Sequence, residues 1–493
     1  MGKKGNLDNI KRQVATGLIW KFLEKVGAQG MQIIIQIVLA RLLLPEEYGL
    51  VGLLTIFITI SDVFILQGLT TALIQKQNAE EIDFSSVFFM NVIISILIYA
   101  FLYILAPYIA IFYNEPKLTN IMRVLSVNVI IGAFPAVHNA ILSRNLDFKK
   151  SFFRNITNVL TQGIVGITLA IHNFGAWAMV YGKIAGTLIG AIVLCITVNW
   201  HPHRMFSLYR IKILFSFSSK VLGANLLNTF FNNIHSLIIG HYYTATNLGY
   251  YQRGQTIPQA VMTSIDGTLS EVLYPSFSKF QNDLELLKKT LRISIRTSMY
   301  IVLPILFGIM ATSKSLTIVL LTDKWLPSVP FMQLSCVVCM FWPLSHRTHA
   351  LNAIGKSNVT FILSLISKGF TLIVIFACVN YSIYAILYGT IMASAINMVI
   401  TSSAVKKYIG YTLGELMRDI FPSLVISGGM CAAVSLFGLL LQTFRVSMLI
   451  ILIGQIVLGI ILYILLSKFF NIESFNYLFA IIQNICRSKM LKR

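Results

Sequence analysis

The sequence predicts an all-α polytopic membrane protein with about fourteen transmembrane helices. Of its 493 residues, 56% are hydrophobic and only 12% are charged, and the mean hydropathy is +0.76. A soluble domain usually carries about twice that share of charged residues. Apolar segments long enough to cross about 30 Å of hydrocarbon follow one another along nearly the whole chain. Most of the protein is therefore expected to face lipid.

Polar or charged connections separate the predicted helices. The helices are expected near 14–40, 48–74, 84–112, 118–142, 152–171, 175–198, 213–240, 248–274, 291–312, 329–353, 358–380, 383–405, 420–441 and 446–467. Inside a bilayer a helix satisfies all of its own backbone hydrogen bonds, so each apolar run is interpreted as a helix rather than a strand.

The distribution of lysine and arginine predicts the orientation in the membrane. These residues gather in alternate connections, such as 144–154, 204–220 and 279–296, and in both terminal segments. By the positive-inside rule this pattern places both termini in the cytoplasm. The same pattern explains the net charge of +21 without a nucleic-acid partner, because no continuous basic face is present.

Two similar helix hairpins predict an internal duplication. The turn Pro45-Glu46-Glu47-Tyr48-Gly49 lies between two apolar segments, and residues 240–251 repeat this arrangement in the second half. The predicted parts are an N-terminal six-helix bundle (1–200), a cytoplasmic amphipathic linker (201–220), a second six-helix bundle (221–405), two additional helices (406–467) and a cytoplasmic amphipathic tail (468–493).

Charged side chains inside the predicted helices are the candidate functional residues. A charge at the bilayer centre costs about 3 kcal/mol or more, so it normally faces a bundle interior or a water-filled cavity. The cationic candidates for substrate binding are Lys25, Lys183, Lys368, Arg123 and Arg347. The acidic candidates for ion coupling or ion pairing are Asp62 and Glu24.

Buried cations outnumber buried anions, which suits an anionic substrate such as a pyrophosphate. Lys25 and Asp62 fall at similar depth on consecutive predicted helices, so an ion pair between them is geometrically possible. Structural and functional roles for that pair remain equally open.

No cofactor, metal centre or catalytic motif is predicted. Cys336, Cys339, His346 and His349 resemble metal ligands in their spacing, but they fall on one predicted helix. Four ligands along a single helix lie too far apart to share one tetrahedral ion, although a site with two of them and outside ligands stays possible. The sequence contains no zinc-protease, nucleophile-elbow or dinucleotide motif, and we do not expect an enzyme.

Several short motifs resemble those of the bacterial polysaccharide flippases, within the multidrug/oligosaccharidyl-lipid/polysaccharide exporter superfamily. The first hairpin has the sequence Leu39-Ala40-Arg41-Leu42-Leu43-Leu44-Pro45-Glu46-Glu47-Tyr48-Gly49. The other similar stretches are Asn145-Leu146-Asp147-Phe148-Lys149-Lys150, Gly175-Ala176-Trp177-Ala178-Met179-Val180-Tyr181-Gly182, Leu248-Gly249-Tyr250-Tyr251-Gln252-Arg253 with Ile257-Pro258, and Leu351-Asn352-Ala353-Ile354-Gly355-Lys356. They extend from about residue 14 to 405, and the last two predicted helices match only in hydropathy.

The resemblance implies two six-helix bundles that form a V around a cavity and open alternately to each face of the bacterial inner membrane. The implied cargo is an undecaprenyl-pyrophosphate-linked oligosaccharide for O-antigen, capsule or exopolysaccharide. Membrane lipids, a polysaccharide polymerase and the chain-length machinery are the implied partners. The matching motifs are structural turns rather than cargo ligands. The loop charges place Arg41 and Arg253 at the outer rim, as gate or anchor residues.

Two other functions are considered. A cation-coupled multidrug antiporter on the same fold predicts coupling through an acidic residue such as Asp62. A membrane polysaccharide polymerase or glycosyltransferase predicts a large outer loop or a cytoplasmic sugar-nucleotide domain. The predicted outer connections are as short as 172–174 and 380–382, so the enzyme is the remote alternative.

Overall fold

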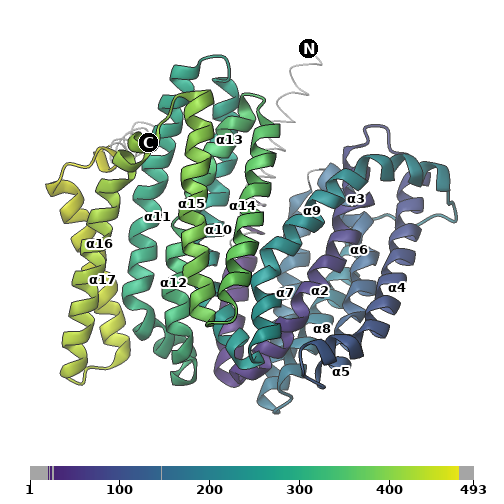
Figure 1. The fold of residues 1–493 in the computed structure, drawn as a ribbon. Helices are drawn as coiled ribbons and strands as arrows, with labels where there is room; N and C mark the ends of the chain where they lie inside the picture. Colours follow the sequence, from purple (N-terminus) through teal and green to yellow (C-terminus); the bar gives the residue numbers. More distant parts are fainter. Residues whose placement is uncertain (1–19, 21–22, 25–26, 146, 477–493) are drawn as a thin grey trace, which may run out of the picture. The chain divides into compact units, whose positions relative to one another are not determined.

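The computed structural model describes residues 20, 23–24, 27–145 and 147–476, with the side chains of residues 217 and 267–275 left aside. Every regular element within these residues is a helix (Figure 1). The chain divides into two compact units between Gly249 and Tyr250. The predicted all-α class is therefore confirmed.

Ten helices in the described part of the chain are long and apolar enough to cross a membrane. This composition makes the chain a multi-pass membrane protein. The other four predicted segments are also helical where described, over Gly27–Leu42, Phe148–Ile171, Leu208–Tyr242 and Ala245–Lys279. They are shorter or more polar than the ten, so the number of fourteen spans stays a prediction.

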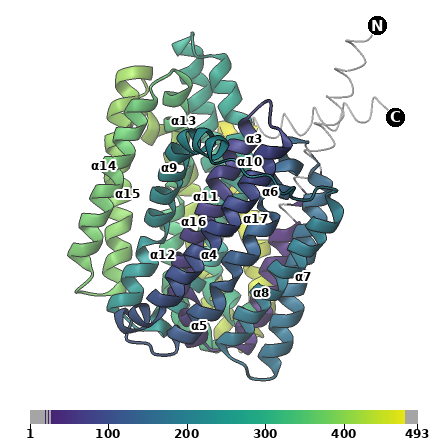
Figure 2. The ribbon, with the colours of Figure 1, turned by 90° about the vertical axis from the view of Figure 1, so that its right-hand side faces the viewer.

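The first unit contains one short apolar helix, Gly27–Leu42, followed by eight labelled helices. These are α2 (Pro45–Gln67), α3 (Leu69–Gln75), α4 (Glu81–Phe112), α5 (Leu118–Leu125), α6 (Val127–Arg144), α7 (Phe148–Ile171), α8 (Ala176–Thr197) and α9 (Leu208–Tyr242). The helices α7 and α8 run side by side in both views (Figures 1 and 2). Close packing of this pair is possible because Gly166, Gly182 and Gly186 leave no side chain at the contact.

The helix α9 packs against α2, α3 and α4 and therefore belongs to the first unit. The sequence had instead predicted a second bundle that begins at 221, after a linker over 201–220. Residues 208–220 of that linker are the first turns of α9, and their apolar side chains Ile211 and Leu214 join a buried core with Leu194 and Val198. Burial of this apolar face explains why the segment is part of the bundle.

Residues of the preceding connection are held on α4 by hydrogen bonds. The backbone N–H groups of His203 and Ser207 donate to the hydroxyls of Ser85 and Ser86, each at 3.0 Å. Both serine side chains are fully buried in the second turn of α4. These bonds fix where the chain enters α9.

The two turns that suggested a duplication pack against each other. A Cβ added to Gly49 would overlap the carbonyl group of Ala245, and a Cβ added to Gly249 would overlap that of Pro45. Each glycine is thus required by the close approach of a backbone from the other turn.

The second unit consists of α10 (Ala245–Lys279), whose first residues precede the division, and of the elements that follow it. These are α11 (Leu284–Leu321), η1 (Asp323–Ser328), α12 (Val329–Cys339), η2 (Trp342–Ser345), α13 (His346–Ala353), α14 (Ser357–Cys378), α15 (Ile383–Ile409), α16 (Leu413–Thr443) and α17 (Met448–Phe469). The helices α14 and α15 pair with each other, whereas α16 and α17 pack on α11. The tyrosine hydroxyls also join α11 to α17, since Tyr300 bonds to Ser467 at 2.9 Å and Tyr463 to the Tyr300 carbonyl at 2.7 Å.

One predicted helix, 329–353, is broken. The helix α12 ends at Cys339, and the one-turn element η2, which contains Pro343, separates it from α13. Proline removes a backbone donor and blocks a continuous helix. The placement of Cys336, Cys339, His346 and His349 on a single helix was therefore wrong. Among the described residues, no group of three or more potential ligands has the geometry to hold a metal ion.

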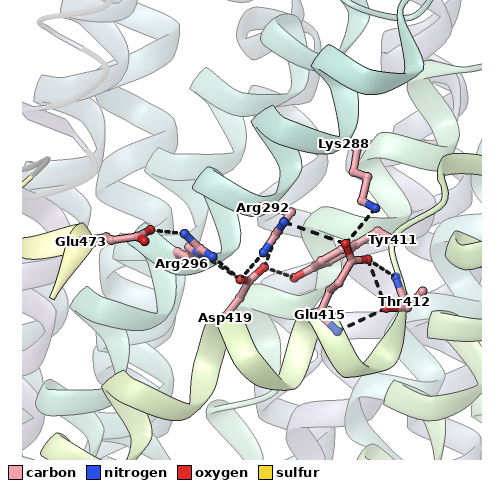
Figure 3. A network of polar contacts seen from close by, with 8 residues as sticks. All are labelled: Lys288, Arg292, Arg296, Tyr411, Thr412, Glu415, Asp419 and Glu473. Carbon is pink, nitrogen blue, oxygen red and sulfur yellow. Dashed lines mark hydrogen bonds and ion pairs between the residues drawn. The ribbon is translucent and has the colours of Figure 1, made fainter.

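A buried carboxylate joins α11 to α16 (Figure 3). The side chain of Asp419 is fully buried and accepts two hydrogen bonds from Arg292, at 2.9 and 2.8 Å, and one from Arg296 at 2.7 Å. The Tyr411 hydroxyl donates to the same carboxylate at 2.8 Å. Burial, together with the charge of Asp419, raises the pKa of Tyr411, so the phenol stays a neutral donor.

The network continues on both sides of Asp419 (Figure 3). The Glu415 carboxylate accepts from the backbone N–H of Thr412 and caps the first turn of α16, and it also forms an ion pair with Lys288 at 2.9 Å. On the other side, Arg296 contacts Glu473, whose side chain is mostly exposed. This network fixes α16 on the second unit.

Candidate functional site

Asp62 and Lys183 are the predicted candidates that interact inside the first unit. Asp62 lies on α2 and Lys183 on α8, and both are partly buried. In the described part of the chain, Lys183 is the charged group that acts on the Asp62 carboxyl. Lys25, the partner suggested for Asp62 by the sequence, lies outside the described residues.

Glu24 takes part in a second polar group of the first unit. Its buried carboxylate accepts a hydrogen bond from Asn155 on α7 and interacts electrostatically with Arg154. Arg154 in turn donates to the side chain of Asn139 on α6 at 2.6 Å. These contacts hold the segment that contains Glu24 against α7.

The arginine candidates of the first unit occupy different surroundings. Arg123 lies in the last turn of α5, with its guanidinium 4.3 Å from the centre of the Tyr103 ring. Its Nε atom is buried and has no hydrogen-bond partner among the described residues. Arg41 is exposed at the end of the helix Gly27–Leu42. Arg123 therefore makes a cation–π contact with Tyr103. The charge of Arg41 faces solvent or lipid headgroups.

In the second unit, Arg253 lies on α10 and is buried, with its guanidinium 5.7 Å from the centre of the Trp325 ring. Lys368 lies on α14 and is partly buried. The two outer-rim candidates therefore differ, because Arg41 is exposed whereas Arg253 stacks on an aromatic ring.

Arg347 lines a polar cavity of about 380 Å³ inside the second unit. The walls come from α10, α12, α13, α14 and α15 and from the turn at Phe341–Ser345. The residues that line it are Asp266, Val338, Phe341, Trp342, Leu344, Ser345, Arg347, Thr348, Ser367, Thr371, Ala393, Ser394, Asn397, Met398 and Thr401. Lys368 is not among these described lining residues, although its neighbour Ser367 is.

The guanidinium of Arg347 is held by several acceptors. Its Nε donates to the Leu344 carbonyl at 3.1 Å, and Nη1 donates to the Met398 carbonyl at 3.0 Å and to the Ser402 hydroxyl at 2.6 Å. These bonds join α13 to α15. Nη2 is the nitrogen left for any further ligand.

A contact between Asp266 and His346 was missed by the sequence analysis. Asp266 had no assigned role, and His346 was considered as a metal ligand together with Cys336, Cys339 and His349. The structure places His346 Nε2 3.4 Å from Asp266 Oδ1, and Ser294 Oγ 3.3 Å from the other ring nitrogen. The signal in the sequence was the pair His346 and His349, two titratable side chains one turn apart within an apolar segment.

Polar and charged side chains inside apolar helices are typical of membrane proteins that move ions or substrates. The sequence profile of the polysaccharide biosynthesis protein family matches residues 38–330, and the chain belongs to that family.

Named relatives agree with this membership. The chain is 25% identical over 366 residues to the succinoglycan biosynthesis transport protein ExoT of Rhizobium meliloti, which covers 73% of this chain and 72% of that protein. It is 24% identical over 452 residues to the teichuronic acid biosynthesis protein TuaB of Bacillus subtilis, with coverage of 90% and 92%.

Among solved structures, the lipid II flippase MurJ in an inward closed conformation has a similar fold. The TM-score is 0.74 at 15% identity, over 92% of this chain and 98% of MurJ. At this identity the likeness shows a common fold and leaves the cargo to other arguments.

Proposed function

We propose that this protein is a flippase that moves undecaprenyl-pyrophosphate-linked oligosaccharides across the bacterial inner membrane by alternating access. The membership of the chain in the polysaccharide biosynthesis protein family, over residues 38–330, carries the proposal. The name of ExoT, a biosynthesis transport protein, supports a transport role within that family. Both termini would lie in the cytoplasm, as the loop charges predict.

Cationic side chains within the units would bind the pyrophosphate and acidic sugars of the cargo. The proposed ligands are Lys25, Lys183, Lys368, Arg123 and Arg347. Lys183 and Lys368 are partly buried, and lysine can redirect its ammonium group to a mobile phosphate. Arg347 would contact cargo through Nη2, because its other nitrogens bind Leu344, Met398 and Ser402.

Coupling through Asp62 and a gate or anchor role for Arg41 and Arg253 belong to the same proposal. A polysaccharide polymerase and the chain-length machinery would take the cargo on the outer side. The second function considered, a multidrug antiporter, would share the fold but would leave polysaccharide assembly intact after gene deletion.

The test is a clean deletion in a strain without a redundant flippase, followed by leaflet-specific labelling of lipid-linked sugars. We expect oligosaccharides to accumulate on the cytoplasmic leaflet and surface polysaccharide to disappear. Complementation with the wild-type chain, but not with a Lys183→Ala and Lys368→Ala double variant, should restore export. Normal surface polysaccharide in the deletion strain would reject the flippase assignment. Full complementation by the double variant would reject these two lysines as cargo ligands.

A further inference from the structure

The pair of Asp266 and His346 joins three helices of the second unit. Asp266 lies on α10 and His346 is the first residue of α13, while Ser294 on α11 lies at the other ring nitrogen. The His346 side chain is fully buried, and that of Asp266 is 23% exposed. The imidazole is thus enclosed between a carboxylate and a hydroxyl.

Two facing atoms of this pair lack a well-directed hydrogen bond. Nε2 of His346 and Oδ1 of Asp266 are both buried, and neither has a hydrogen-bond partner among the described residues, although they lie only 3.4 Å apart. Buried polar atoms in folded proteins are nearly always bonded, so an orphaned pair calls for a physical explanation. A proton placed between these two atoms supplies the missing bond.

Ser294 allows His346 to exist in both charge states. When the imidazole is neutral and Nε2 carries no proton, its Nδ1–H group donates to the Ser294 hydroxyl oxygen. When the imidazole is protonated, both ring nitrogens donate, and the same hydroxyl oxygen accepts. The 3.3 Å contact has the same donor and acceptor in both charge states, so protonation of His346 at Nε2 requires no rearrangement of α11.

The polar cavity provides access for protons. Asp266 forms part of its wall, whereas His346 is fully buried and is not among the described lining residues. Hydroxyls in the wall already donate to their own helices, as Thr348 does to Ser345, Thr371 to Ser367 and Ser394 to Thr390. Each of these hydroxyl oxygens can still accept a hydrogen bond, and a polar cavity of about 380 Å³ has room for water molecules.

Further charged and titratable side chains of the described residues lie close to the pair. On α13 they are Arg347 and His349, whose ring centre is 6.4 Å from that of His346. His349 interacts electrostatically with both members of the pair, and Tyr411 with Arg347. The helix α11 contributes the neutral Ser294, and α15 contributes Ser402, which binds Arg347.

We infer that Asp266 and His346 form a proton-binding site in the second unit, and that its occupancy controls the charge of the polar cavity. A proton from the cavity binds Nε2 of His346, and the carboxylate and imidazolium then form a neutral pair. When the proton leaves to cavity water, the pair carries one negative charge. Histidine is suited to this role because its charge changes near neutral pH. Coupling of this site to cargo movement rests on the proposed flippase function.

The binding of the proton is tested by NMR on the full-length protein with ring-labelled histidines. We expect one buried histidine signal, absent in His346→Gln, to shift as the pH of the sample is changed. Asp266→Asn should shift its midpoint to lower pH, because it removes the carboxylate that stabilises the imidazolium. His203→Gln in the first unit is the control and should leave this signal unchanged. A His346 signal that does not titrate, or that ignores Asp266→Asn, would overturn the assignment.

Coupling is tested in vesicles that contain a trapped pH-sensitive dye and the full-length protein. The probe is lipid-linked oligosaccharide extracted from a strain that lacks this protein. We expect the probe to produce a change in lumenal pH that falls about tenfold or more in Asp266→Asn and His346→Gln. If the wild type moves the probe without a pH change, coupling is rejected. If it moves no probe at all, the flippase proposal fails, whereas the NMR titration still decides the proton site.

Discussion

Each unit of this protein contains a carboxylate influenced by a basic side chain of another helix, and the two basic partners differ. In the first unit, Lys183 on α8 acts on Asp62 on α2. In the second unit, His346 on α13 lies 3.4 Å from Asp266 on α10. A lysine ordinarily keeps its proton throughout the physiological pH range, whereas a histidine loses or gains one within it.

This difference separates two roles, cargo binding and coupling, that the sequence alone does not distinguish among buried charges. The Lys183 side chain supplies a charge of constant sign, which suits the binding of an ionic cargo. The Asp266 and His346 pair supplies a charge that depends on proton occupancy, which suits coupling. Asp419 provides a third, purely structural case, since two arginines and a tyrosine saturate its carboxylate.

The largest effect is expected at Asp419, whose carboxylate has a purely structural role. Asp419→Asn should lower the free energy of unfolding by about 3 kcal/mol, because two arginines lose a fully buried partner. Urea unfolding of the purified protein measures this loss. Glu473→Gln is the matched control, and its effect should be below about 1 kcal/mol because the Glu473 side chain is 80% exposed. Equal stability of Asp419→Asn and the wild type would contradict a structural role.

A charge reversal in the first unit should have the next largest effect. Lys183→Glu places two carboxylates near each other in an apolar bundle, and we expect a loss of about 2 kcal/mol in unfolding free energy. Thermal unfolding and the yield of folded protein measure the loss. The double variant Asp62→Lys and Lys183→Glu restores opposite charges and should recover most of it. Additive losses in the double variant would show that the two side chains do not interact.

The pH profile of export distinguishes the two units most directly. For the wild type in vesicles, we expect export rates at about pH 6 and about pH 8 to differ by about tenfold. His346→Gln should remove this difference, because its side chain cannot bind the proton. Lys183→Met should lower the rates at both pH values by the same factor. A flattened profile in Lys183→Met would reverse the roles assigned to the two units.

The smallest effect is expected at Ser294. Ser294→Ala removes the hydroxyl that serves both charge states of His346, and it should cost about 1 kcal/mol or less. The pH dependence of the His346 signal should change, because a charged N–H donor loses more than a neutral one when its acceptor is removed. Ser298→Ala is the control one turn away on α11, since the Ser298 hydroxyl has no hydrogen-bond partner among the described residues. A midpoint that moves equally in both variants would argue against a specific role for Ser294.

Local sequence pattern predicted the helices well where polar residues bound a long apolar run. The prediction 84–112 corresponds to Glu81–Phe112, and 175–198 corresponds to Ala176–Thr197. The pattern did not predict the break between α12 and α13, because the apolar character continues through Trp342 and Pro343. Hydropathy measures the affinity of a segment for lipid and does not report its backbone geometry.

The candidate charges were visible in the sequence, but their partners were not. Lys183, Lys368 and Arg347 stand out because lysine and arginine are costly inside apolar helices. The hydrogen bonds of Arg347 to Met398 and Ser402 depend on the packing of α13 against α15. The sequence therefore shows that Arg347 is a buried cation but does not show that most of its hydrogen-bond donors already have partners in the protein.

The sequence by itself determined the membrane environment, the helical class and the family, because each follows from local composition and short motifs. Only the tertiary structure decided that α9 joins the first unit and that Asp266 faces His346 across two helices. The physical reason is that apolarity along a helix selects lipid or protein as its surroundings, whereas the contact of two distant polar groups depends on how the helices cross. In this protein the packing of α10 and α13 brings Asp266, which had no predicted role, next to His346, and the two form the proposed proton site.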